Sequence, residues 1–529
     1  MVVQAKAFEG PSKDGIEHKS GEAIDEVDLV LAQQDGKILR KEAVLCRHPP
    51  RQKCTNCLPL DPYDEEYLKE KDIKHMAYHS LVRKLTDLHG KGSSTKPLEN
   101  INCSLKLNCA GGHKPYPKGI CTKCRPPTLT LMRQRFRHVD NITIENSDVV
   151  NSFLNFWRKS SYQRVGYLIG TYEPFADVPL GIKAVIGAVY EPPQSSDQDR
   201  VKFEADPNEA EVDLLCQSLG LKRVGWIFTD LWSADLKQGT VHCIRHEDSF
   251  LLSAAECITA GHLQSKHKNY TKFCHDGYFG SKFVTVVASG DKTQQIHFSG
   301  YQVSNQCTAM VEANILCPTV SNPELAWVRE KPLHEHHYIT DVQYTEKDEY
   351  GAEVLRNGRP MPVEYLLVDV PTGVPLEPRA TFTVVEDPAK AFAIENRSLI
   401  GEDQSLTNMA KYIASFQPEQ FLEMAANFHF LLFLLTNDHV KLSSEEVDVL
   451  AKCVIAKDSD GANIWDKSNE NWGTLKELAA ADLAMGGSKR SNAAGSSSAV
   501  QSSKWSCSHC TFENTDSRDC AMCGLPADS

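Results

Sequence analysis

The chain has 529 residues, of which 41% are hydrophobic and 24% are charged, and its formal net charge is −13 at pH 7. A chain of this length is long for a single hydrophobic core, so we expect several domains. The acidic balance disfavours a protein whose main task is to bind a nucleic-acid backbone, because that task needs clustered Lys and Arg.

Cysteine usage and hydrophobicity indicate the compartment. Ten of the 18 Cys fall into clusters that contain Cys-x-x-Cys pairs, which favours zinc in a reducing compartment over a disulfide framework. The start, Met1–Lys6, has no apolar stretch of the secretory type, and the longest apolar run, Phe428–Leu435, is too short to span a bilayer. We predict a cytoplasmic and nuclear protein without membrane insertion, and leave open a peripheral association with the ER.

The stretch from Cys46 to Cys124 carries two sets of three Cys and one His, each ending in a Cys-x-x-Cys pair. Zinc favours four tetrahedral nitrogen and sulfur ligands, and this pair is the tightest loop that places two thiolates on one ion. Disulfides and incidental buried thiols are the alternatives that this pattern disfavours. The predicted ligand sets are Cys46, His48, Cys54 and Cys57, and Cys109, His113, Cys121 and Cys124.

The first set stays open at one position, because His75 or His79 could replace one of its members, Cys46 or His48. Between the sets, Tyr63–Leu88 has helical spacing. We predict a disordered segment at residues 1–24 and a double zinc-finger domain at 25–128.

From residue 129 to 370 the pattern becomes α/β. The basic run Arg133–Arg137 fits either a nucleic-acid contact or a face that pairs with acidic groups, and His334–His337 reads as a polar loop. The elements expected here are the strands Arg164–Gly170, Lys183–Tyr190 and Arg223–Thr229, a helix capped by Asp206 and closed by Gly220, a helix over Ser249–Ala260, and a hairpin of Phe283–Ser289 with Gln295–Val303.

After residue 370 the chain turns helical, and we predict a helical domain at 371–485, a flexible Gly/Ser/Ala linker at 486–503 and a separate module at 504–529. The expected helices are Leu406–Phe416, Pro418–Thr436 and Ser443–Ile455.

The terminal module contains two Cys-x-x-Cys pairs, which predict one zinc ion held by Cys507, Cys510, Cys520 and Cys523. A segment this short cannot bury Phe512, so its ring is expected to be exposed and free to anchor a partner. With the two sets above, the sequence predicts three structural zinc ions.

This module resembles the zinc ribbon of the ubiquitin-binding RanBP-type class. The resemblance implies that Thr511, Phe512 and Met522 contact the apolar patch of ubiquitin.

The runs Gly166–Gly170 and Val224–Asp230 resemble an MPN domain. In metalloproteases of this fold a Glu, a His-x-His and an Asp hold a catalytic zinc and its water. The matching positions here are Gln163, Phe228, Asp230 and Glu256. Phe binds no metal and Gln is a poor general base, so we expect an MPN domain without catalytic ligands and no enzymatic activity.

The order of these parts, with the phrase Arg137–Asn141 after the second Cys/His set, is similar to the nuclear protein localization protein 4 family. The fold class expected is multidomain α+β. The family implies a non-enzymatic adaptor that binds ubiquitin and polyubiquitin chains, pairs with a ubiquitin-fusion-degradation partner, and delivers substrates to a hexameric AAA ATPase of the valosin-containing type for unfolding and proteasomal or ER-associated degradation. Such proteins normally begin with a UBX-like domain, which residues 1–24 are too short to form.

Two other classes of function stay in competition with the adaptor. The MPN-like strands allow a metal-dependent deubiquitinase, and the Cys/His sets allow a zinc-finger protein that binds nucleic acid.

Overall fold

The computed structural model describes residues 23–484, except for short gaps at 41–45, 50–51, 53, 55, 90–95, 107–108, 110, 236–237, 320 and 385–390. Outside this span it describes the backbone of residues 2–3, 485–491, 504–506 and 513–515. The terminal zinc-ligand candidates and the three residues expected to contact ubiquitin lie outside the described residues.

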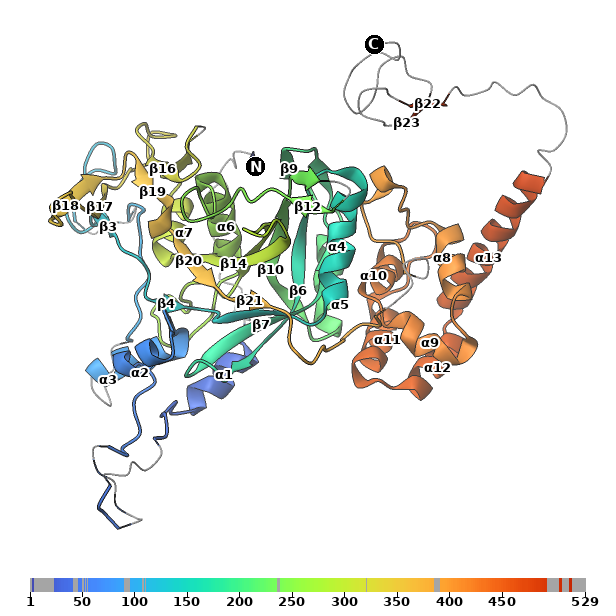
Figure 1. Cartoon of the computed structure of the whole chain (residues 1–529), viewed down its shortest axis with the longest axis horizontal. Coiled ribbons are helices and arrows are strands. Elements are labelled where there is room, and N and C mark those ends of the chain that lie inside the picture. The colour runs from blue at the N-terminus through green and yellow to red at the C-terminus, as the bar shows by residue number, and fades with distance from the viewer. Residues whose placement is uncertain are drawn as a thin grey trace.

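An eight-stranded mixed sheet forms the centre of the chain (Figure 1), with the order β20-β14-β13-β10-β6-β7-β5-β21. Most neighbours are antiparallel, whereas the pairs β10–β13, β5–β7 and β5–β21 are parallel. The strands are β5 (Asn141–Ile144), β6 (Val165–Phe175), β7 (Gly181–Tyr190), β10 (Lys222–Asp230), β13 (Val284–Gly290), β14 (Ile296–Val303), β20 (Leu367–Val370) and β21 (Thr372–Gly373).

Helices cover both faces of this sheet, because apolar residues of its central strands alternate between the two sides. Leu168 and Ile227 belong to a core shared with α1 (Glu26–Gln33) and α4 (Ser147–Ser160). Trp226 and Phe228 belong to a second core, which includes residues of α6 (Ala254–Lys266) and α7 (Asn305–Glu312).

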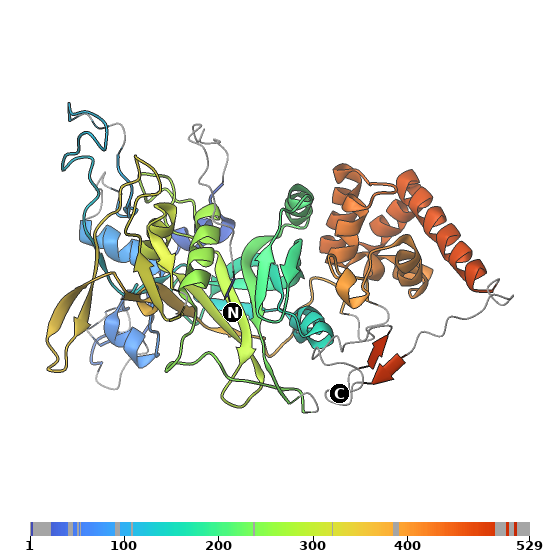
Figure 2. The same cartoon turned by 90° about the horizontal axis from the view of Figure 1, so that it is seen from above.

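A group of helices lies to one side of the sheet (Figures 1 and 2), and it shares its core with the sheet. Helix α5 (Glu209–Ser218) contributes Val212 and Leu215 to the same apolar cluster as Phe430 and Trp472. The helices of this group are α8 (Leu406–Ala414), α9 (Phe421–Ala425), α10 (Phe428–Thr436), α11 (Ser444–Ala456), α12 (Ser459–Ser468) and α13 (Glu470–Ser491).

The remaining helices and strands lie outside the eight-stranded sheet and the helical group. They are α2 (Glu65–Glu70), α3 (Tyr78–His89), β1 (Val2–Val3), β2 (Met76–Ala77), β3 (Leu129–Leu131), β4 (Phe136–Arg137), β8 (Gln194–Ser196), β9 (Arg200–Phe203), β11 (Ser233–Asp235), β12 (Thr240–Val241), β15 (Leu316–Pro318), β16 (Leu325–Val328), β17 (Val342–Lys347), β18 (Glu353–Asn357), β19 (Met361–Pro362), β22 (Lys504–Ser506) and β23 (Glu513–Thr515). Among the described helices, none is both long and apolar enough to serve as a membrane span.

The predicted hairpin is present, since β13 and β14 pair antiparallel with Thr285 opposite Tyr301. The prediction of one helix over Tyr63–Leu88 is wrong. Helices α2 and α3 are separated by Asp72, which has a φ of 53°, and by β2, which pairs with β4. A strand pairing distant in sequence therefore overrides the local helical periodicity.

The helix predicted to be capped by Asp206 begins two residues later than expected, at Glu209, with Asn208 at the N-cap position. Asp206 instead accepts hydrogen bonds from the Asn208 N–H (2.9 Å) and from the Tyr190 hydroxyl (2.9 Å), so its side chain fixes the approach to the helix. The predicted end is correct, because Gly220, with a φ of 65°, follows the C-cap residue Leu219.

The helix predicted over Ser249–Ala260 is shifted, and α6 runs past Gly261 to Lys266. A Cβ on Gly261 would lie 2.9 Å from a Val311 methyl group, so this glycine permits the close approach of α6 and α7 rather than ending the helix. At its start, Ser253 and Glu256 form a capping box.

The helix predicted over Pro418–Thr436 is broken in two, because the Asn427 side chain caps α10 by accepting from the Phe430 N–H (3.1 Å). The sequence also did not separate α12 and α13. Helix α13 continues to Ser491, six residues into the segment expected to be a linker.

Candidate metal centres

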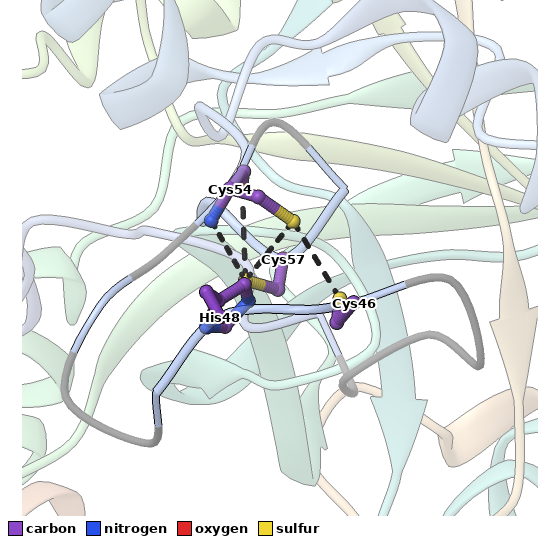
Figure 3. Close-up of side chains that lie close together, drawn as sticks. All are labelled: Cys46, His48, Cys54 and Cys57. Atoms are coloured by element: carbon purple, nitrogen blue, oxygen red, sulfur yellow. Dashed lines mark hydrogen bonds between the residues drawn. The ribbon is translucent and has the colours of Figure 1, made fainter.

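The first Cys/His set converges in a loop before α2 (Figure 3), where one ligand atom from each of Cys46, His48, Cys54 and Cys57 lies within 4.8 Å of the others. The Sγ atoms of Cys46 and Cys54 are 3.6 Å apart, and those of Cys54 and Cys57 are 3.8 Å apart. Four ligands about 2.3 Å from one ion in a tetrahedron place two sulfurs about 3.8 Å apart. The thiol spacing therefore fits a single zinc ion.

The histidine of this set presents the nitrogen that a metal needs. His48 Nδ1 lies 3.0 Å from the Pro49 carbonyl oxygen, which only accepts, so Nδ1 carries the proton. The unprotonated Nε2 then faces the set, 3.1 Å from Cys57 Sγ. A carbonyl that fixes the tautomer in this way is a common support of a metal-binding histidine.

The second set repeats this arrangement, with Cys109, His113, Cys121 and Cys124 within the same 4.8 Å limit. Cys121 Sγ lies 3.5 Å from Cys109 Sγ and 3.8 Å from Cys124 Sγ. His113 Nδ1 donates to the Lys114 carbonyl oxygen (2.7 Å), and its Nε2 lies 3.4 Å from Cys124 Sγ. The donor atoms again fit one tetrahedral zinc.

Backbone N–H groups favour the thiolate form in both sets. A hydrogen bond from the backbone of Asn56 lowers the pKa of Cys54 to about 7, and those of Cys124 and Lys123 lower the pKa of Cys121 to about 6. Since the thiolate is the form that binds a metal, these two sulfurs are prepared to act as ligands near neutral pH.

The two alternative histidines of the first set lie elsewhere. His79 Nε2 is bonded to Asp28 Oδ1 at 2.8 Å and is buried beside α1. His75 Nδ1 lies 3.7 Å from an Asp369 carboxylate oxygen, and burial lowers the pKa of His75 to about 4. His79 therefore pairs with α1 and His75 approaches β20, which favours Cys46 and His48 as members of the first set.

A third cluster of charged groups lies on the central sheet, at the positions that the sequence matched to catalytic zinc ligands. Asp230 ends β10 and Glu256 lies in the first turn of α6, and the Arg245 guanidinium joins them at 2.7 Å from each. Burial lowers the pKa of Arg245, but Glu256 and Asp230 outweigh this and raise it, so the guanidinium keeps its charge.

The other two positions do not complete a metal site. Gln163 is held at the end of β10, since its amide donates to the Leu231 carbonyl (3.0 Å) and accepts from the Thr229 hydroxyl (2.8 Å). Phe228 is fully buried, with the Arg245 guanidinium 5.5 Å from its ring centre. Sequence reasoning missed Arg245, because a single Arg in a loop carries no motif.

A family model with the description "NPL4 family" matches residues 164–480, and a second, "NPL4 family, putative zinc binding region", matches residues 22–161, which contain both Cys/His sets. The relative "Nuclear protein localization protein 4 homolog 1" of Caenorhabditis elegans is 56% identical over 524 residues, or 96% of this chain and 98% of that protein. This chain belongs to the NPL4 family.

Mammalian members of the NPL4 family are also similar over most of this chain. The homologues of Rattus norvegicus and Homo sapiens are 45% and 44% identical, and each comparison covers 95% of this chain and 82% of the relative. The resemblance seen in the sequence is therefore confirmed. The zinc-binding region of the family coincides with the part of the chain in which the Cys and His side chains converge.

In this NPL4-family chain, two arginines of the basic run are paired with acidic groups. Arg133 contacts Glu364 at 2.6 Å, and Arg137 contacts Asp369 at 3.1 Å. These ion pairs favour the interpretation of the basic run as a face that pairs with acidic groups. They also reduce the positive charge that this run could offer to a phosphate backbone.

The His-rich loop contacts the loop that carries the second Cys/His set. His336 Nδ1 lies 2.7 Å from the carbonyl oxygen of Tyr116, which precedes Cys121 in the same loop. Nearby, Arg125 pairs with Asp341 at 3.2 Å.

For the terminal module, the described residues are the two short strands β22 and β23. They pair antiparallel, with Trp505 opposite Asn514. The expected ligands Cys507, Cys510, Cys520 and Cys523, and the expected contacts Thr511, Phe512 and Met522, lie outside the described residues, so their roles stay predictions.

Proposed function

We propose that this protein is a non-enzymatic adaptor that recruits polyubiquitylated substrates to a hexameric AAA ATPase of the valosin-containing type, together with a ubiquitin-fusion-degradation partner. Membership in the NPL4 family is the observation that carries the proposal, because both family models together span nearly the whole described chain. The substrates are then unfolded for proteasomal or ER-associated degradation in the cytoplasm and nucleus.

The two Cys/His sets are proposed as structural zinc sites on a surface that rests against the ATPase ring. Their geometry supports a structural role, because each set offers four protein ligands to one ion and leaves no position for a reacting water. A third zinc is proposed in the terminal ribbon.

The central α/β part is proposed to be an MPN domain that has lost its catalytic function. Support comes from the chemistry of its face, where Phe228 replaces a ligand and Arg245 fills the space between the two acidic side chains. A zinc-dependent peptidase needs about three protein ligands around the ion and a free position for water. The deubiquitinase alternative therefore lacks support.

The terminal ribbon is proposed to bind ubiquitin through Thr511, Phe512 and Met522. The test is a calorimetric titration of monoubiquitin into the full chain, the Phe512→Ala variant and a Leu376→Ala control, whose apolar side chain is fully exposed elsewhere. Loss of one buried aromatic contact lowers affinity by roughly 1.5–3 kcal/mol. We expect this loss for Phe512→Ala and none for Leu376→Ala.

The outcomes separate the parts of the proposal. If the full chain binds neither ubiquitin nor polyubiquitin, the adaptor function is wrong. If it binds and Phe512→Ala leaves the titration unchanged, the ribbon is not the contact. Cleavage of polyubiquitin that a chelator abolishes would instead establish an enzyme.

A further inference from the structure

The N-terminal end of the chain pairs with a strand that is distant from it in sequence. Strand β1 lies parallel to β9, with Val3 opposite Val201, and completes the small sheet β1-β9-β8. It also lies beside α6, and Figure 1 shows the N-terminus next to β9. The composition of residues 1–24 gave no indication of this pairing, so it calls for a physical reason.

Strand β9 presents a row of backbone groups on the side away from β8. Toward β8, the Asp197 N–H donates to the Arg200 carbonyl (2.9 Å), and the Arg200 N–H donates to Asp197 Oδ1 (2.7 Å). Because the backbone groups of alternate residues point to opposite sides of a strand, those of Val201 and Phe203 point away from β8. Without β1 this side of β9 would be an open edge, and open edges pair readily with other extended chains.

The side chains of the same two residues hold this edge in place. Val201 is 1% exposed and belongs to the apolar core that contains Trp226 and Leu263 of α6. The ring of Phe203 stacks on the ring of Tyr167, with 5.6 Å between their centres. The edge is therefore formed before any partner strand binds, which lowers the entropic cost of adding one.

The position of β1 does not follow from the fold of the neighbouring segment. Helix α1, the next helix in the chain, packs in the core on the opposite face of the sheet from α6. Residues 4–25 join β1 to α1 and would span roughly 70 Å if fully extended. Attachment through a connection of this length keeps a segment at an effective concentration of roughly 1 mM. The pairing of β1 with β9 therefore reflects an attraction between the two strands.

We propose that the outer edge of β9 is a strand-acceptor site and that the N-terminal segment of this chain, beginning at Val2, is its occupant within the same molecule. Main-chain hydrogen bonds supply the affinity in strand addition, so the site recognises an extended segment more than a particular side chain. Val2 and Val3 suit it because β-branched residues favour the extended conformation. While β1 is in place the edge is closed to extended segments of other polypeptides, and release of β1 opens it.

The test measures hydrogen exchange of the peptide 198–205, which contains β9, by mass spectrometry of the full chain. Four proteins are compared: wild type, a deletion of residues 2–6, Val2→Pro/Val3→Pro and Val2→Thr/Val3→Thr. Proline has no N–H to donate to a neighbouring strand, whereas threonine keeps the N–H and the β-branched shape. We expect exchange at least roughly tenfold faster in the deletion and proline variants than in wild type, and unchanged exchange in the threonine variant.

A synthetic peptide of residues 1–8 tests the acceptor site from outside. At roughly 1 mM it should restore slow exchange of 198–205 in the deletion variant, and the same peptide with both valines replaced by proline should not. Three results would overturn the proposal: equal exchange in wild type and the deletion variant, fast exchange in the threonine variant, or no effect of the peptide. Slow exchange that depends on the concentration of wild-type protein would place β1 on a second copy of the chain and also contradict it. None of these results depends on ubiquitin binding.

Discussion

Glu191 is a buried carboxylate that joins the sheet to the segment before the helical group. It lies directly after β7 and accepts from Arg164 Nε at 2.6 Å and from Arg397 Nε at 3.0 Å, with all three side chains at most 3% exposed. Burial raises the pKa of Glu191, but Arg397 and Arg164 more than offset this and hold it below its usual range, so the carboxylate stays ionised. Removing it would leave two buried guanidinium groups facing each other.

We expect Glu191→Ala to lower the free energy of unfolding by about 3–5 kcal/mol, the usual cost of breaking a buried ion pair on one side. At roughly 2–4 °C per kcal/mol, this is a fall in melting temperature of roughly 10 °C. Scanning calorimetry measures it, and hydrogen exchange should rise first in residues 391–405, which carry Arg397. Lys452→Ala is the control, because Lys452 is 69% exposed and its pair with Asp448 contributes about 0.5 kcal/mol or less. A fall for Glu191→Ala no larger than that of the control would refute the reasoning.

Three further predictions follow from other parts of the chain. Burial raises the pKa of Asp140 to about 7, whereas the same carboxyl in the unfolded chain loses its proton near pH 4. The folded protein therefore loses stability as the pH rises between these two values. In urea unfolding, Asp140→Asn should stabilise the protein by up to about 4 kcal/mol at pH 8 and make no difference at pH 4. Elemental mass spectrometry after exhaustive dialysis should find three zinc ions per chain and two in Cys121→Ser, whereas an unchanged count would remove the second set as a site. Gly261→Ala should destabilise the protein by roughly 1–3 kcal/mol, because α7 lies against this glycine. Gly473 has open space around it, so Gly473→Ala should be neutral or stabilise the protein by up to roughly 1 kcal/mol. Thermal unfolding of the two variants compares these effects directly.

The sequence was most informative where the interacting groups are neighbours in the chain. The Cys-x-x-Cys pairs and their nearby His residues predicted that each set of four side chains would converge, and the structure brings them within 4.8 Å. The β13–β14 hairpin was likewise predicted, because its strands are adjacent and periodic. The choice between Cys46 and the two alternative histidines needed the structure, since it depends on Asp28 and Asp369, which are distant from the first set in sequence.

What the sequence did not predict depends on contacts between distant segments. The break between α2 and α3 follows from the pairing of β2 with β4, and the continuation of α6 through Gly261 follows from its contact with α7. Arg245 is the clearest case on the candidate face. In the sequence, its partners, Asp230 and Glu256, stand at positions that match the zinc ligands of metalloproteases. The ion pairs that they form with Arg245 become visible only when the fold brings β10 and α6 together.

The sheet and the helical group of this chain are joined through a shared apolar core. Helix α5 belongs to the sheet region in sequence, yet Val212 and Leu215 pack in the same cluster as Trp472 of α13. The ion pair between Glu191 and Arg397 joins the sheet to the segment that leads into α8, and Arg164, directly before β6, holds the same carboxylate from the sheet side. The shared apolar core and the buried ion pairs both oppose separation of the sheet from the helical group. The contribution of the core falls when an apolar side chain is shortened, and that of the ion pairs falls when a charge is removed. On the proposed function, the sheet and the helical group therefore act as one rigid support, and loosening them at Glu191 should weaken substrate delivery to the ATPase before it weakens ubiquitin binding.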